Sequence, residues 1–287
     1  MIGNTRRALS GTALLIIGLS MPVPLSAANP PPAQGGCPEG RLPLYSHNDY
    51  RSRRPLYDAL DAGFRGIEVD LFLVDGVLRP GHSRREARRI RSFEEMYLEP
   101  LDSLARSCRG AAWLADGTPL LLLLEIKEAS TTTYDSVFAA LERHRELFVA
   151  AGRDTVAPVE VVFVGWLPPA AYSFHHGAET FSRRQQRMHQ PTDTLLEKDG
   201  WPVRVISVDY GKTMGRWWRR ESDRARWREA LSVVKRRSPR QLLRVHNVPP
   251  DSGVLAQLFA AGADLVGATN VQAFARLMSS GSDGPKH

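Results

Sequence analysis

The chain has 287 residues, a formal net charge of +7, 43% hydrophobic residues and 24% charged residues. This length suffices for one large domain with a full core, and the composition is that of a soluble globular protein. No stretch after the N-terminal segment is apolar over the roughly 20 residues that a membrane-spanning helix needs. The positive charge favours encounter with anionic molecules or an anionic membrane surface, but it defines no reaction.

The N-terminal segment has the pattern of a secretory signal peptide. Two arginines at positions 6 and 7 precede an apolar run over 8–19, and small residues follow at 26–28. This order predicts a cleavable signal over residues 1–28 and a secreted or periplasmic protein; the alternative is a short membrane anchor. Cleavage would remove both arginines and lower the net charge from +7 to +5. The proline- and glycine-rich stretch 29–40 is then expected to be a flexible leader.

The chain has two cysteines, Cys37 and Cys108. In an oxidising compartment such a pair favours a disulfide, and neither cysteine has the spacing of a metal site. The alternative is two unrelated buried thiols.

Strand-like and helix-like stretches then alternate along one domain over 41–280, with a disordered tail over 281–287. The pattern predicts strands over 42–46, 66–74, 119–126, 159–164, 203–208, 242–245 and 265–267, and one more near 179–182. A tight turn at 75–76 leads to a returning strand over 77–79. Helices are predicted between these strands over 55–62, 93–107, 134–149 and 224–235, from 249–251 onward, and over 271–278. This alternation favours an α/β fold with a parallel sheet.

Two carboxylates share one face of the second predicted strand. Glu68 and Asp70 are two residues apart, so both side chains point the same way between apolar neighbours. Burying two adjacent carboxylates is costly unless a cation compensates them, and a hard divalent cation binds oxygen ligands. The alternative is an exposed edge strand with solvated acids.

The leucine-rich strand ends with a similar pair, Glu125 and Lys127. In a barrel of parallel strands, the carboxyl ends of the strands form the rim of the active site. Glu125 is therefore expected to join Glu68 and Asp70 as a third metal ligand, and Lys127 to contact a phosphate. The alternative is a simple ion pair at the barrel mouth.

Two histidines complete the candidate site. His47 follows the first predicted strand, and the turn at 75–76 returns the chain so that His82 lies near Glu68 and Asp70. Histidine exchanges protons near neutral pH, so the two are expected to act as base and acid at the same end of the barrel. The two roles can be exchanged, because the sequence carries no geometry.

These motifs together resemble the glycerophosphodiester phosphodiesterase family within the phospholipase C-like superfamily. The ordered pieces are His47, Gly66-Ile-Glu68-Val-Asp70, Asp75-Gly76, His82, Glu125-Ile-Lys127 and the C-terminal stretch 262–270. The segments Ser46-His-Asn-Asp-Tyr50 and Arg54-Pro-Leu-Tyr-Asp-Ala-Leu60 resemble its branch named "altered inheritance of mitochondria 6" more closely. The resemblance spans 42–128 and, more weakly, 242–278. It implies a (β/α)₈ TIM-type barrel and a phosphodiester hydrolase that uses one Ca²⁺ or Mg²⁺.

The chain also departs from that family. The family has Arg-Gly after the first histidine, where this chain has Asn48 and Asp49, and the family's Glu-Asn-Thr motif is missing. We therefore expect Asn48, Asp49 and either Arg53 or Arg54 to take over substrate contacts. His246, which ends a predicted strand, is expected to line the same pocket.

Three rival functions remain open: a catalytically silent barrel that binds lipid or sugar phosphates, a lyase of the sphingomyelinase D type, and a metal-independent phosphatidylinositol phospholipase C-like enzyme. The expected substrate is a small phosphodiester or one derived from a phospholipid. The arginines and tryptophans of 216–228 allow peripheral contact with an anionic membrane, although acids dilute their charge. Neither a nucleic acid nor an obligate protein partner is expected.

Overall fold

The computed structural model describes residues 37, 42–108, 117–148, 157–167, 184–187, 202–214 and 221–280. The predicted signal peptide, the strand near 179–182, the stretch 216–220 and the C-terminal tail lie outside these residues. Within them, no helix is long and apolar enough to cross a membrane.

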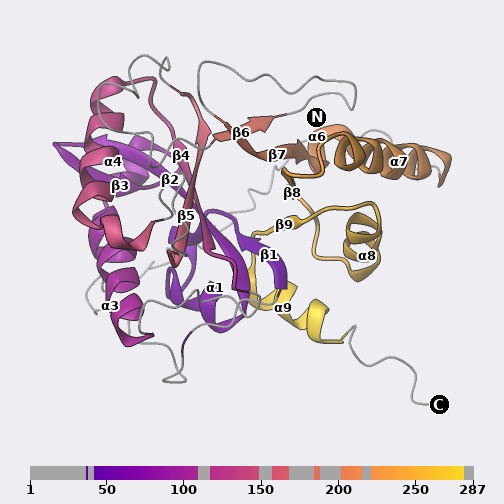
Figure 1. The fold of residues 1–287 in the computed structure, drawn as a ribbon, viewed down its shortest axis with the longest axis horizontal. Helices are drawn as coiled ribbons and strands as arrows, with labels where there is room; N and C mark the ends of the chain where they lie inside the picture. The colour runs from indigo at the N-terminus through magenta and orange to yellow at the C-terminus, as the bar shows by residue number, and fades with distance from the viewer. Residues whose placement is uncertain are drawn as a thin grey trace, which may run out of the picture.

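Parallel strands form a closed ring. In order of pairing they are β1 (Leu42–Ser46), β2 (Phe64–Val74), β4 (Leu120–Ile126), β5 (Val159–Gly165), β6 (Arg184–Arg187), β7 (Val203–Asp209), β8 (Leu242–His246) and β9 (Leu265–Ala268), which returns to β1. The strand β3 (Val77–Pro80) extends β2 as an antiparallel hairpin. Between β5 and β6 the ladder consists of one pair, Phe163 with Arg184. The predicted parallel barrel is confirmed (Figure 1).

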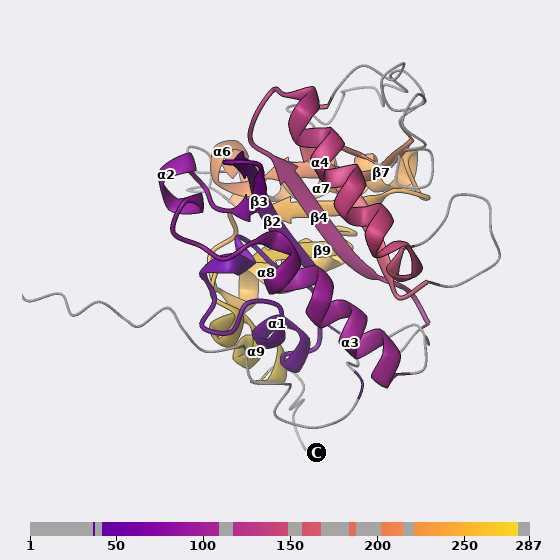
Figure 2. The ribbon, with the colours of Figure 1, turned by 90° about the vertical axis from the view of Figure 1, so that its left-hand side faces the viewer.

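Helices lie on the outside of the ring. They are α1 (Tyr57–Asp61), α2 (Arg84–Ala87), α3 (Glu99–Ser107), α4 (Thr131–Arg143), α6 (Tyr210–Met214), α7 (Glu221–Arg237), α8 (Ser252–Ala260) and α9 (Val271–Ser280), with a π-helical turn η2 (Glu94–Leu98) and 3₁₀ turns η1 (Asp49–Arg51) and η3 (Arg145–Leu147). Figure 1 shows α3 and α4 on one side of the strands and α7 and α8 on the other. Turned by 90°, Figure 2 shows α3 and α4 lying over β2 and β4.

The alternation of side chains along β4 creates two apolar cores. Leu120, Leu122 and Leu124 pack outward against the helices, whereas Leu121 and Leu123 point into the barrel. The inner cluster is small and consists of Tyr45, Leu121, Leu123, Val162, Val164, Val205 and Leu265. The run of leucines is therefore a strand buried on both faces, as predicted.

Local interactions move several predicted boundaries. The helix α4 begins at Thr131 rather than at 134, because the Ser130 side chain caps it by accepting from the Thr133 amide. The predicted helix over 93–107 is divided into η2 and α3, with Pro100 in the first turn of α3. The short helices α2 and α6 were not predicted.

Two sequence-based expectations about chain connections are confirmed. Asp75 and Gly76 have φ angles of 51° and 78°, the left-handed pair that a two-residue hairpin turn requires. Cys37 and Cys108 form a disulfide that closes a separation of 71 residues. It joins the segment before β1 to the end of α3.

Candidate active site

A buried ion pair lies directly above the inner apolar cluster. Arg244 on β8 donates through Nη2 to Glu68 Oε1 on β2 at 2.5 Å, and both side chains are 2% exposed. The guanidinium carbon also lies 4.4 Å from the centroid of the Tyr45 ring. Gly267 makes room for this ring, because a Cβ at that position would lie 2.5 Å from the tyrosine oxygen. Arg244 therefore compensates the charge of Glu68 inside the barrel.

His47 lies on the other side of Glu68. Its Nε2 is 3.3 Å from Glu68 Oε2, and its amide donates to the carbonyl of Ala268, which fixes the end of β1 against β9. Burial, together with the nearby charge of Arg244, lowers the pKa of His47 from 6.5 to about 4. Burial raises the pKa of Glu68 in spite of Arg244. At neutral pH His47 is consequently uncharged and can accept a proton.

Asp70 is surrounded by three donors. Its Oδ2 lies 2.8 Å from His82 Nδ1, 3.0 Å from the Tyr50 hydroxyl and 3.1 Å from Lys127 Nζ. The hairpin of β2 and β3 brings His82 to this position, as the sequence predicts. The His82 amide also donates to Glu86, which Arg51 holds from the other side.

The two histidines thus flank Glu68 and Asp70 at the carboxyl end of the barrel. His47 approaches from the end of β1 and contacts Glu68, while His82 approaches from beyond β3 and contacts Asp70. Their environments differ, because the His82 side chain is 59% exposed and that of His47 only 16%.

The third predicted carboxylate joins this group through Lys127. Lys127 Nζ lies 2.9 Å from Glu125 Oε1 and so connects Glu125 to Asp70. Burial raises the pKa of Asp70, and the Lys127 charge opposes that rise. The predicted ion pair at the mouth is therefore present, and it includes Asp70 as well as Glu125.

The same carboxylates carry the oxygen donors that a hard divalent cation prefers. Within the described part of the chain, Glu68 Oε2 and Asp70 Oδ1 are buried and accept no hydrogen bond, which is costly for ionised oxygens. Among those residues, however, no group of three or more acidic, histidine or cysteine side chains is arranged so that it could hold a metal ion. Lys127 and Arg244 instead form ion pairs with Asp70 and Glu68. The donors therefore suit a hard cation in chemistry, and the cation itself remains a prediction.

A second polar group faces the first across the barrel. Ser207 Oγ lies 3.1 Å from His246 Nδ1 and 3.5 Å from Arg244 Nη1. His246 Nε2 lies 3.5 Å from Asp209 Oδ2, which also accepts from Asn247 at 3.0 Å. The pKa of Asp209 is lowered, because hydrogen bonds from the Lys212 amide and from Asn247 outweigh its burial. His246 therefore lies at the barrel mouth, next to an acid that sequence reasoning missed, and it is not among the residues that line the cavity beside His47.

The predicted substrate contacts near His47 divide into two groups. Asp49 is fully buried, accepts from the Leu56 amide and the Tyr97 hydroxyl, and has its pKa raised to about 6 by burial. Arg54 bonds to Asp58 and Asp61. This geometry gives no support to the predicted substrate contacts of Asp49 and Arg54, because both side chains stabilise the turn before α1.

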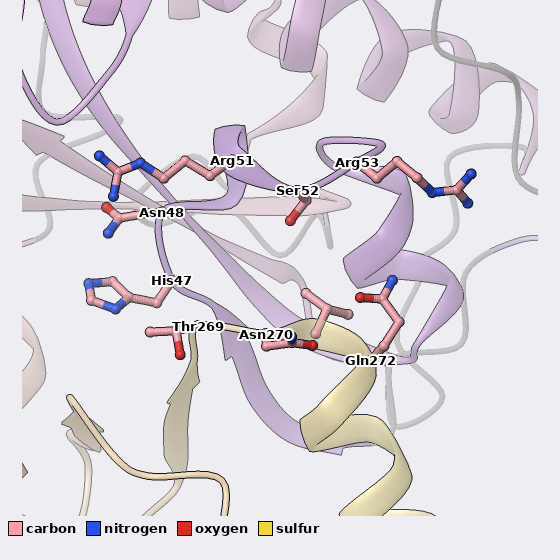
Figure 3. Close-up of a pocket in the computed structure, with 9 residues that line it drawn as sticks. His47, Asn48, Arg51, Ser52, Arg53, Thr269, Asn270 and Gln272 are labelled. Atoms are coloured by element: carbon pink, nitrogen blue, oxygen red, sulfur yellow. The ribbon is translucent and has the colours of Figure 1, made fainter. Parts of the chain in front are cut away.

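Asn48 and Arg53, in contrast, line a cavity beside His47. The cavity has a volume of about 270 Å³ and is lined by His47, Asn48, Arg51, Ser52, Arg53, Thr269, Asn270, Val271 and Gln272. Figure 3 shows His47, Asn48 and Arg51 at one side and Arg53 and Gln272 at the other, with Ser52 and Asn270 between them. Of the two arginines considered from the sequence, Arg53 is the one at the cavity.

A closed parallel ring thus carries two histidines, three acids and a lysine at its carboxyl-end mouth. Residues 40–168 match the family model of the AIM6-like phosphodiesterase domain. The resemblance inferred from the motifs is thereby confirmed for the stretch that holds both histidines, the three acids and Lys127. Arg244, Ser207, Asp209 and His246 lie outside the matched residues.

Known proteins that are similar to this chain include one relative and two solved structures. The altered inheritance of mitochondria protein 6 homolog of Arthroderma benhamiae is 26% identical over 145 residues, 43% of this chain and 46% of that protein, so the match spans less than half of the relative. The glycerophosphodiester phosphodiesterase of Agrobacterium tumefaciens has a TM-score of 0.46 and 14% identity over 81% of this chain and 98% of its own. A tryptophan synthase complex from Pyrococcus furiosus has a TM-score of 0.46 and 12% identity, covering 84% and 94%.

Proposed function

We propose that this protein is a metal-dependent phosphodiester hydrolase in which His47 and His82 act as general base and general acid. The observation that carries the proposal is the placement of two histidines on either side of Glu68 and Asp70 at one barrel end. The family match to a phosphodiesterase domain over the same residues supports it.

The different environments of the histidines suit different roles. His47 is uncharged at neutral pH, because burial lowers its pKa to about 4, and it takes a proton from the attacking water. Glu68 Oε2, 3.3 Å from Nε2, then stabilises the imidazolium that forms. His82, held by Asp70 through Nδ1, gives its proton to the leaving alkoxide as the phosphorus–oxygen bond breaks.

Cationic groups stabilise the phosphate. Lys127, between Asp70 and Glu125, supplies a positive charge to a non-bridging phosphate oxygen. Glu68, Asp70 and Glu125 would hold one Ca²⁺ or Mg²⁺. When bound, such a cation supplies Lewis-acid stabilisation of the phosphate charge.

The test compares hydrolysis of bis(4-nitrophenyl) phosphate and of glycerophosphodiesters by the wild type and by His47→Ala and His82→Ala. Each variant should lose about 10²–10⁴-fold in kcat, the usual contribution of a general acid or base. The matched control is His144→Ala, because His144 pairs with Asp102 on α3, away from the barrel mouth. Activity should also disappear with a chelator and return with Ca²⁺ or Mg²⁺.

Each alternative has its own outcome in this experiment. No turnover with any cation, in a folded protein, identifies a silent barrel. Turnover that persists in chelator identifies a metal-independent reaction. Heavy-oxygen water separates hydrolysis, which transfers the label to the phosphate, from a lyase reaction, whose cyclic product carries none.

We further propose that the mature protein is secreted or periplasmic and begins near Asn29. The positive, apolar and small-residue order of residues 1–28 supports this location. Mass spectrometry of the mature protein should find residues 1–28 removed. A mature chain that retains them would contradict a cleaved signal.

A further inference from the structure

The cavity beside His47 is lined almost entirely by polar groups. Two of its walls carry arginines, Arg51 and Arg53, and Ser52 and Thr269 contribute hydroxyls. None of the described residues that line it is an aspartate or a glutamate, and Val271 is the one aliphatic residue among them. Such a lining offers hydrogen-bond donors without negative charge, which favours an anion over a cation or an acyl chain.

The two arginines are not equivalent. Arg51 donates through Nε and Nη2 to the Glu86 carboxylate at 2.9 Å, so much of its charge is already compensated. Arg53 is exposed, and no ion pair of this residue occurs among the described residues. Arg53 is therefore the principal uncompensated charge at the rim of the cavity, and Figure 3 shows its guanidinium extending away from His47. The N-terminal end of α9, which Asn270 caps through the Ala273 amide, adds a smaller positive potential.

The size of the cavity limits what it can hold. Its volume of about 270 Å³ lies just below the roughly 300–1,000 Å³ of sites that enclose drug-sized ligands. A small polar head group fits this volume, and a lipid chain fits neither the volume nor the lining. Because His47 belongs both to the cavity and to the catalytic group, an alcohol attached to the reacting phosphate reaches the cavity directly.

We propose that this cavity binds a second anionic group of the substrate, a phosphomonoester on the alcohol next to the scissile phosphodiester. The inference rests on the proposed hydrolase function for the reacting phosphate. It goes further in naming the substrate class as phosphorylated polyol phosphodiesters and in assigning Arg53 to their selection.

A matched pair of substrates tests the selection. Glycerophosphoinositol and glycerophosphoinositol 4-phosphate differ by one phosphomonoester. The wild type should have a kcat/KM for the phosphorylated substrate about tenfold higher, and Arg53→Gln should lower this ratio about fivefold, the effect expected for one exposed charge pair. The control Arg240→Gln removes the same charge from an exposed residue just before β8, at the opposite end of the barrel, and should leave the ratio unchanged.

A second variant separates binding from folding. Gln272→Glu places an acid in the first turn of α9, where negative charge is favourable for a helix. The thermal midpoint should therefore not fall, while the preference for the phosphorylated substrate should be lost. An unchanged preference in Gln272→Glu, or equal ratios in Arg53→Gln and Arg240→Gln, would overturn the proposal. A wild type without preference would do the same.

A direct titration keeps this proposal distinct from the hydrolase function. If the wild type hydrolyses neither substrate, the proposed function fails, but calorimetric titration with inorganic phosphate still tests the cavity. Arg53→Gln and Gln272→Glu should each weaken phosphate binding about fivefold relative to the wild type and Arg240→Gln. Equal affinities in all four proteins, or no phosphate binding by the wild type, would refute an anion site.

Discussion

Removing Arg244 leaves a buried carboxylate without its main counter-charge. In Arg244→Met the apolar stem is kept, but Glu68, which is 1% exposed, loses the guanidinium. Breaking a buried pair in this way typically costs about 3–5 kcal/mol, because the remaining charge is desolvated and uncompensated. We expect the free energy of unfolding to fall by about 2–5 kcal/mol at pH 8, because a proton taken up by Glu68 or His47 limits the loss.

The loss should depend on pH, because a proton can replace the missing charge. If Glu68 takes that proton, the free energy of unfolding falls at pH 8 by the free energy of protonating a carboxyl whose unfolded pKa is 4.5, about 5 kcal/mol. If His47 takes it, with an unfolded value of 6.5, the cost is about 2 kcal/mol. At pH 5 the cost is about 0.7 kcal/mol through Glu68 and none through His47. A group whose folded pKa is raised contributes stability at low pH and loses it as the pH rises, so the variant is weakest in alkali.

The assay is urea unfolding of the wild type and Arg244→Met at pH 5 and pH 8, in chelator so that no cation substitutes for the guanidinium. The stability difference between the two proteins should be larger at pH 8 by about 2–4 kcal/mol. Adding Glu68→Gln to Arg244→Met should remove most of this pH dependence. Equal losses at both pH values, or a loss at pH 8 below about 1 kcal/mol, would refute the reasoning.

Other predictions concern separate parts of the molecule. Burial raises the pKa of Asp49 from 3.8 to about 6. Its ionisation should therefore lower the stability of the wild type by about 2.4 kcal/mol between pH 4 and pH 7, and urea unfolding of Asp49→Asn should lack this decline. The Cys37–Cys108 disulfide closes a separation of 71 residues, and its loss in Cys37→Ser/Cys108→Ser should lower the free energy of unfolding by about 4 kcal/mol; a loss below about 1 kcal/mol would contradict this. Ca²⁺ at 100 times its Kd should stabilise the wild type by about 2.7 kcal/mol in thermal unfolding, and Glu125→Gln should reduce this gain; equal shifts would argue against Glu125 as a ligand.

The parts of the site that the sequence predicted depend on local geometry. The two-residue period of a strand places Glu68 and Asp70 on one face, and the turn at Asp75–Gly76 brings His82 back beside them. Both relations hold within a short stretch of chain, so they can be inferred without knowing the barrel. The strands could also be predicted from local sequence, because parallel strands that are buried on both faces consist of short apolar runs.

The parts that were missed depend on contacts between distant strands. Arg244 and Glu68 are 176 residues apart, and nothing near Arg244 in the sequence marks it as an interior residue. The one available signal was its spacing of two residues from His246, which predicts that both share the inward face of β8. Asp209 had the same kind of signal, because it lies two residues after Ser207 at the end of β7. Arg54 is the opposite case, because two acids that are near it in the sequence, Asp58 and Asp61, bind its side chain.

Gly267 bears on how the site could be altered by evolution or by design. Any larger residue at this position on β9 would collide with the Tyr45 ring, and that ring supports Arg244 from below. A substitution that never touches a substrate would therefore tilt the guanidinium and, through it, Glu68 and His47. A mutant library restricted to the rim of the barrel would leave this adjustment unexplored. Paired substitutions at positions 45 and 267 would therefore change the position of Arg244 from beneath the site.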